Sequence, residues 1–136
     1  MSIITLTTDL GYRDPYLGIV KAQLYSHIPS AKIVDLSCAV RENNISHAAF
    51  IIKNSLPHFP VNTIHLVAVK FIADHSGLNK SSHIDNTRFL ITYYKNQFIV
   101  SPDTGLFTLL DKDFNEPVYQ IYYEGKHKSH FFLKDI

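Results

Sequence analysis

The order of apolar segments in the first half of the chain is the feature that most constrains its fold. Residues 3–8, 31–36 and 63–69 are short, apolar and rich in β-branched side chains, which is typical of strands buried on both faces of a parallel sheet. In the two intervening segments apolar residues recur at helical spacing, which predicts helices. Because such alternation produces right-handed crossovers, we predict an α/β fold with a mostly parallel sheet flanked by helices.

Start and stop signals bound the two predicted helices. Asp14-Pro15 is typical of an N-cap followed by the first helical residue, and Pro29 ends this helix. Asn43 or Asn44 is expected to cap the second helix. The predicted apolar stripe of the first helix consists of Leu17, Val20, Lys21, Leu24 and Ile28. That of the second consists of Ile45, Ala48, Ala49, Ile52 and Leu56.

Beyond the third strand the pattern changes. Residues 73–87 are polar and without periodicity, so we predict a mobile loop. Residues 88–94 and 97–101 are expected to form an antiparallel hairpin, and a further strand is predicted at 118–123. The chain ends in an apolar segment without a turn. We therefore expect residues 1–136 to be one α/β domain, the first part of a longer protein.

Composition and charge restrict the partners. The 136 residues are 46% hydrophobic and 18% charged, as in ordinary globular proteins. With a net charge of +1 there is no basic excess to neutralise phosphates, so we expect no nucleic-acid partner. The apolar runs are far shorter than the roughly 20 residues of a membrane helix, and the first residues lack a signal-peptide pattern. The single cysteine, Cys38, cannot form an internal disulfide, and we expect a cytoplasmic protein without membrane contact.

In open α/β sheets, ligands bind beyond the carboxyl ends of the strands. Here those ends carry Asp9, Asp35, Lys70 and the turn at 102–105. Asp9 is the strongest candidate, because a carboxylate after a buried strand can accept hydrogen bonds from both hydroxyls of a vicinal diol such as a ribose. Alternatively, Asp9 caps its own turn or pairs with Arg13.

Several common site motifs are missing from the sequence. It has no Gly-rich dinucleotide fingerprint, no phosphate-binding P-loop and no nucleophile elbow. Asp74, His75, His83 and Asp85 share one loop but lack the spacing of a helical zinc motif, so we expect no metal site. Cys38 has no local signature of a nucleophile and is interpreted as a structural thiol.

Seven blocks, in this order along the chain, carry a family resemblance. They are I-I-T-L-T-T-D-L-G (3–11), D-P-Y-L-G-I-V-K (14–21), I-V-D-L-S (33–37), A-A-F (48–50), H-F-P (58–60), T-I-H-L (63–66) and S-P-D-T-G-L-F-T (101–108). Together they resemble the S-adenosylmethionine hydrolases, also called SAM hydroxide adenosyltransferases, which are relatives of fluorinase and chlorinase. The resemblance covers only the N-terminal α/β domain of that family. It implies a homotrimer in which each active site lies between the N-terminal domain of one subunit and the smaller C-terminal β domain of its neighbour.

The resemblance also implies a substrate site. Asp9 corresponds to the carboxylate that holds the ribose hydroxyls. Asp14 and Tyr16 lie in the segment that lines the nucleoside–methionine pocket. Asp103 and Thr104 match a D-N-G turn in which Thr104 replaces Asn. The implied reaction is attack of water on the ribose C5′ of S-adenosylmethionine, with adenosine and methionine as products and no further cofactor.

The sequence departs from the family at two motifs that surround the water. Lys70 stands where the family has the acid of a D-P-G-V-G run, and Phe132 stands where it has the histidine of an H-G-R-D motif. Lys80 and Arg88 are both near the family's arginine position, and the loop length leaves the choice between them open. We keep Lys70 as a substrate contact and leave the catalytic residues unassigned.

Two hypotheses of different class follow. The first is an S-adenosylmethionine hydrolase. The second is a non-catalytic protein that binds a nucleoside or S-adenosylmethionine, or that only forms a structural trimer, and it is motivated by Lys70 and Phe132. A third, a flavodoxin-like domain for a phosphate ligand, lacks the Gly-rich loop that would support it.

Overall fold

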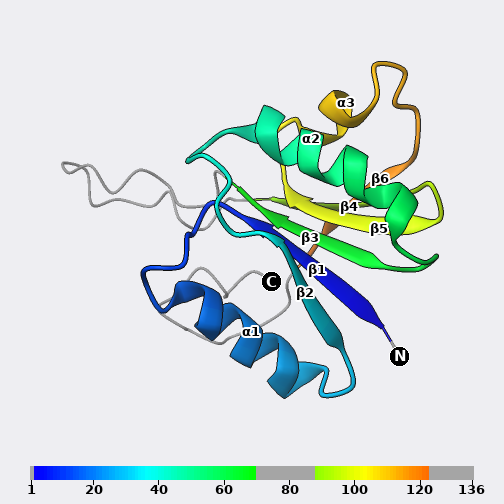
Figure 1. Ribbon diagram of the computed structural model, residues 1–136. Helices are drawn as coiled ribbons and strands as arrows, with labels where there is room; N and C mark the ends of the chain where they lie inside the picture. Colours follow the sequence, from blue (N-terminus) through cyan, green and yellow to red (C-terminus); the bar gives the residue numbers. More distant parts are fainter. Residues whose placement is uncertain (1, 70–87, 123–136) are drawn as a thin grey trace.

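The computed structural model describes residues 2–69 and 88–122. Their strands form one six-stranded sheet in the order β2-β1-β3-β5-β4-β6 (Figure 1). β1 pairs in parallel with β2 and β3, and β3 with β5, whereas β4 is antiparallel to β5 and β6. This confirms the prediction of a mostly parallel sheet with an antiparallel hairpin. The strands are β1 (Ile3–Thr8), β2 (Lys32–Ser37), β3 (Ile64–Ala68), β4 (Phe89–Tyr94), β5 (Gln97–Pro102) and β6 (Val118–Ile121).

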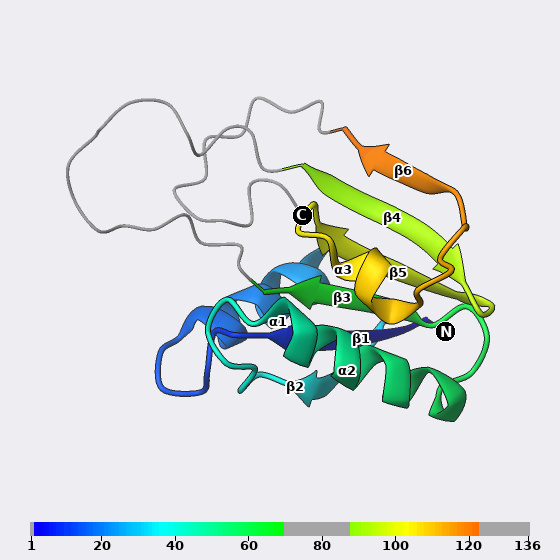
Figure 2. The same ribbon diagram turned by 90° about the horizontal axis from the view of Figure 1, so that it is seen from above.

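The helices lie on both faces of the sheet. Figures 1 and 2 show α1 on one face and α2 with α3 on the other. The chain runs outwards from β1 to β2 through α1 and returns past β1 to β3 through α2. When two crossovers have the same handedness but run in opposite directions along the sheet, their helices lie on opposite faces of the sheet. The helices are α1 (Tyr16–His27), α2 (Ile45–Ser55), the 3₁₀ turn η1 (Leu56–His58) and α3 (Leu106–Leu110).

The start of α1 differs from the prediction. Pro15 already has helical dihedral angles (φ −74°, ψ −4°) and occupies the N-cap position, and its carbonyl accepts a hydrogen bond from the Ile19 N–H at 3.0 Å. Asp14 therefore precedes the cap, is exposed, and makes no hydrogen bond or ion pair with the described residues. The prediction that Asp14 caps this helix is wrong, because the proline takes the cap position itself.

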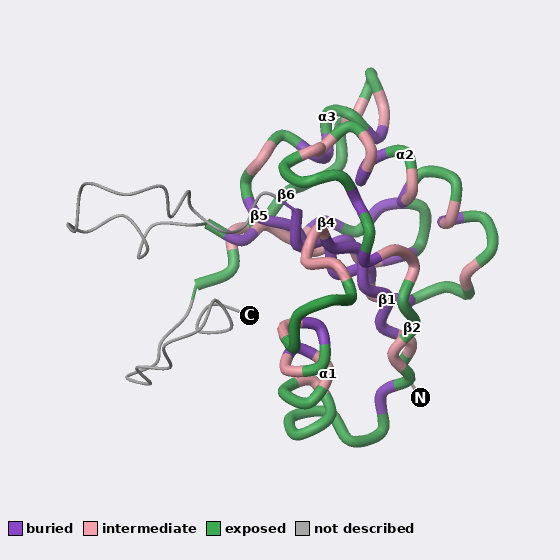
Figure 3. Tube along the Cα trace, turned by 60° about the vertical axis from the view of Figure 1, so that its left-hand side comes forward, coloured by how far each residue is buried: buried purple, intermediate pink, exposed green. Residues whose placement is uncertain are grey.

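Few apolar side chains anchor α1 to the sheet. Leu17 and Val20 are buried, and Leu24 packs against the same cluster, as predicted. Ile28 was expected to continue the stripe but is 38% exposed, because the backbone leaves the helical path at this residue (φ −133°, ψ 74°). Figure 3 shows that exposed and half-buried residues make up most of this helix.

α2 covers the opposite face much more completely. Its start is fixed by Asn44, whose Oδ1 accepts a hydrogen bond from the His47 N–H at 2.9 Å, as predicted. The predicted apolar stripe is confirmed, since Ala48, Ala49, Ile52 and Leu56 are buried and Ile45 packs against them. These side chains form one cluster with β3, β5 and α3.

The hairpin between β4 and β5 turns at Lys95 and Asn96. Both residues have positive φ, 50° and 63°, as a two-residue hairpin turn requires. β6 confirms a strand in the segment predicted at 118–123. The predicted loop at 73–87 lies outside the described residues. Among residues 2–69 and 88–122 no helix has both the length and the apolar character needed to cross a membrane.

A line of buried hydrogen bonds crosses the sheet beneath α2. The Thr5 hydroxyl lies 2.7 Å from His65 Nδ1, and His65 Nε2 lies 2.7 Å from Gln97 Oε1. The Gln97 amide nitrogen donates to the Leu56 carbonyl at 2.8 Å, so its Oε1 is the acceptor. His65 consequently carries its proton on Nε2 and accepts from Thr5 at Nδ1. Burial lowers the pKa of this neutral imidazole below its ordinary value.

This histidine predicts acid sensitivity. The unfolded chain binds a proton near the ordinary His pKa of about 6.5, whereas folded His65 resists protonation, so the unfolding free energy falls as the pH drops below about 6.5. Urea unfolding at pH 7.5 and pH 5.0 measures this fall. In His65→Gln the fall should be smaller than in the wild type.

His58→Gln is the matched control, because His58 is exposed at the end of η1. It should keep the wild-type difference between the two pH values. An undiminished difference in His65→Gln would show that another group causes the acid sensitivity.

Candidate functional site

The carboxyl ends of β1, β3 and β5 meet at one edge of the sheet. Thr8 is in register with Ala68, and Leu66 is in register with Val100 two residues before the end of β5. Asp9 and Asp103, which directly follow β1 and β5, are thus at the same level, with β3 between them. Two strand spacings place them about 10 Å apart. The strand order reverses beside β1, which is where open α/β sheets bind ligands.

Asp9 is half-buried and held by the loop that follows β2. Its Oδ2 accepts a hydrogen bond from the backbone N–H of Asn43 at 3.0 Å. Asn43 has φ +58°, a left-handed conformation that Asn tolerates better than most residues. A second hydrogen bond joins the loop after β1 to the loop after β2, because the Gly11 N–H donates to the Cys38 carbonyl at 2.7 Å. The orientation of the Asp9 carboxylate therefore depends on the backbone of the β2–α2 loop.

The turn after β5 carries the second group of predicted site residues. The Thr104 N–H donates to the Pro102 carbonyl at 2.8 Å, and its hydroxyl lies 3.3 Å from the same oxygen. Gly105, with φ +83°, supplies the left-handed residue from which α3 starts. The Asp103 carboxylate forms an ion pair with the guanidinium of Arg88. Asp103 and Thr104 are thus held within one short turn at the edge that also carries Asp9.

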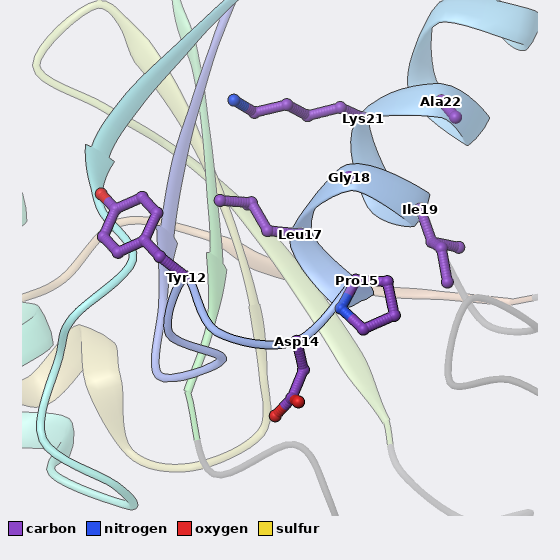
Figure 4. Close-up of a pocket in the computed structure, with 8 residues that line it drawn as sticks. All are labelled: Tyr12, Asp14, Pro15, Leu17, Gly18, Ile19, Lys21 and Ala22. Carbon is purple, nitrogen blue, oxygen red and sulfur yellow. The ribbon is translucent and has the colours of Figure 1, made fainter.

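Asp14 lies at an open hollow of about 560 Å³ alongside α1. In Figure 4, Leu17 and Lys21 project towards the sheet, whereas the Asp14 carboxylate points away from them. Tyr16 is half-buried and is not part of the lining. The predicted site residues therefore divide between this hollow and the sheet edge. The hollow is lined by Tyr12, Asp14, Pro15, Leu17, Gly18, Ile19, Lys21 and Ala22.

Two other candidates have structural roles. The Asp35 carboxylate, expected at a strand end, accepts a hydrogen bond from Lys21 Nζ at 2.6 Å and so links β2 to α1. Cys38 is fully buried, and this burial raises the pKa of its thiol. A protonated, inaccessible thiol agrees with the structural interpretation of this residue.

Some predicted residues lie outside the described part of the chain. They include Lys70, Lys80 and Phe132, and also the residues at 74–85 that were weighed as metal ligands. In the described part, no group of three or more His, Cys, Asp or Glu side chains is placed to hold a metal ion.

Two contacts of the site go beyond the sequence predictions. Arg88 opposite Asp103 follows from the hairpin itself, because a two-residue turn that pairs Tyr94 with Gln97 also places residue 88 opposite residue 103. The contact of Asn43 with Asp9 has no comparable signal. It depends on the dihedral angles of a loop, which no periodicity reports.

Comparison with known proteins identifies the family of the chain. A family model described as the SAM hydroxide adenosyltransferase N-terminal domain matches residues 4–136. The chain is 32% identical over 112 residues to the (R)-S-adenosyl-L-methionine hydrolase of Methanocaldococcus jannaschii, covering 79% of this chain and 39% of that protein. It is 28% identical over 109 residues to the protein of the same name from Thermus thermophilus, covering 80% of this chain and 38% of that protein. The chain thus spans about two-fifths of the length of these curated relatives.

Solved structures share the fold. A conserved hypothetical protein from Thermus thermophilus superposes with a TM-score of 0.67 at 25% identity, covering 90% of this chain and 48% of that one. An uncharacterized conserved protein from Thermotoga maritima gives a TM-score of 0.75 at 24% identity, covering 98% of this chain and 49% of that one. The match of the family model over residues 4–136 shows that this chain belongs to the SAM hydroxide adenosyltransferase family and matches its N-terminal domain.

Proposed function

We propose that the protein containing this chain hydrolyses S-adenosylmethionine to adenosine and methionine. The observation that carries the proposal is the place of Asp9, a half-buried carboxylate directly after a central parallel strand, where the strand order reverses. Two carboxylate oxygens can accept hydrogen bonds from the 2′- and 3′-hydroxyls of a ribose. Family membership supplies the substrate class.

The proposed reaction is a substitution at the ribose C5′. The water oxygen forms a bond to C5′ while the C5′–S bond breaks, the sulfonium leaves as the neutral thioether of methionine, and the water loses a proton. Since the leaving group is already cationic, the reaction needs little acid assistance. What the protein must supply is alignment and a poorly hydrated nucleophile.

We assign substrate contacts accordingly. Asp9 would hold the ribose hydroxyls, and Asp103 and Thr104 would contact the ligand from the end of β5. Asp14 would contact the ligand from the hollow at the start of α1. Tyr16, which does not line this hollow, is kept as a contact on the resemblance alone. Lys70 is kept as a contact on the resemblance alone.

We also propose a homotrimeric, cytoplasmic protein, as the family resemblance implies. Three large apolar side chains exposed on one face of β4 and β6 support an assembly, because exposed apolar side chains that lie together mark interaction sites. They are Tyr93 on β4 and Tyr119 and Ile121 on β6.

Removal of the Asp9 carboxylate should abolish most of the activity. With the full-length protein and S-adenosylmethionine, chromatography should detect equal amounts of adenosine and methionine. Asp9→Ala should lower kcat/KM at least about a hundredfold, because two hydrogen bonds to a charged acceptor are lost. Asp113→Ala, on an exposed residue after α3, is the control and should match the wild type.

Three outcomes separate the hypotheses. Adenosine formation that depends on Asp9 supports the hydrolase. Calorimetric binding of S-adenosylmethionine or adenosine without turnover would favour a non-catalytic binder, and the absence of both would leave a structural role.

The loop that holds Asp9 can be tested separately. Asn43→Val places a β-branched residue at a positive φ, which is strained by roughly 1–2 kcal/mol, and should turn the N–H away from Asp9. We expect KM to rise about tenfold. Asn43→Gly accommodates the same φ and should stay close to the wild type.

Asn62→Val is the matched control. Asn62 also has a positive φ, 64°, but precedes the amino end of β3, at the opposite edge of the sheet. It should lower the unfolding midpoint without changing KM. If it raised KM as much as Asn43→Val, the effect would be one of general stability.

A further inference from the structure

We infer that Arg88 is a positioning residue that orients Asp103 towards the ligand. The inference rests on the proposed function only in that Asp103 contacts the substrate. Its evidence is the cross-strand pair that these residues form at the carboxyl edge of the sheet.

Strand direction brings Arg88 to this edge. β4 is antiparallel to β5, so the beginning of β4 lies beside the end of β5. Phe89 is in register with Pro102, which places Arg88 opposite Asp103. The Asp103 N–H donates to the Arg88 carbonyl at 2.8 Å, and the Arg88 guanidinium bonds to the Asp103 carboxylate. Backbone and side chain thus connect the same two residues twice.

The two oxygens of the Asp103 carboxylate differ in their surroundings. Arg88 Nη2 donates to Oδ2, whereas Oδ1 makes no hydrogen bond to residues 2–69 or 88–122. The Asp103 side chain is 36% exposed. One oxygen is therefore fixed by Arg88, whereas the other has no partner among the described residues, at the edge that also carries Asp9.

Stability gives little reason for this pair. The Arg88 side chain is 61% exposed, and exposed ion pairs contribute little to the free energy of unfolding. A guanidinium is nevertheless a planar, directional donor, so it can fix the orientation of a carboxylate where a lysine ammonium would not. Loss of the ion pair between Arg88 and Asp103 should therefore change the orientation of the turn.

Amide hydrogen exchange of the full-length protein tests the inference without reference to activity. In Arg88→Met the amides of Asp103 and Thr104 should exchange several-fold faster than in the wild type, while the unfolding midpoint stays the same. Lys112→Met, which removes an exposed cation after α3, is the control and should leave both unchanged. Unaltered exchange in Arg88→Met would overturn the inference.

Turnover of S-adenosylmethionine gives the second readout through a double-mutant cycle. Arg88→Met should raise KM about tenfold, and KM of Arg88→Lys should lie between those of the wild type and Arg88→Met. In an Asp103→Asn background, Arg88→Met should add almost nothing, because Arg88 acts through Asp103. Independent, multiplying effects would overturn the inference. If the wild-type protein forms no adenosine, the proposed function fails and hydrogen exchange alone decides the role of Arg88.

Discussion

The positions of Asp9 and Asp103 depend on how the central parallel strands are aligned. The hydrogen bonds from Thr5 through His65 and Gln97 to the Leu56 carbonyl join β1, β3, β5 and η1 in one buried line. A slip of one residue would turn these polar groups to the other face and leave buried donors and acceptors unpaired. The network therefore favours a single register, and with it a common level for the strand ends.

That common level is what makes a binding edge from residues far apart in the sequence. Asp9 and Asp103 come from strands separated by β3, yet they follow strand ends that lie at the same level of the sheet. Neither carboxylate relies on its own turn alone, because Asn43 holds the first and Arg88 the second. The strands set the distances between these groups, and the neighbouring segments set their orientations.

Much of this arrangement follows from sequence patterns. The strands and both long helices lie within one or two residues of the predicted bounds. Buried β-branched runs are compatible with strands, and the apolar stripe of α2 is compatible with a helix. The errors fall at the two ends of α1. Whether Pro15 is the cap or the first helical residue, and whether Ile28 stays on the helix, depends on local dihedral angles that periodicity does not report. For the same reason the sequence does not predict the contact of Asn43 with Asp9. The contact between Arg88 and Asp103, by contrast, follows from the register of the hairpin.

The two faces of the sheet are covered very unequally. α2 rests on a cluster that continues into β3, β5 and α3, whereas Leu17 and Val20 are the only buried residues of α1. Segments with so few buried contacts open at a lower free energy than the core that carries them. The first turn of α1, which contains Tyr16 and Leu17, is therefore expected to open at a lower free energy than the sheet. In the proposed hydrolase, opening of this turn would give the substrate a way in and out that requires no rearrangement of the strands.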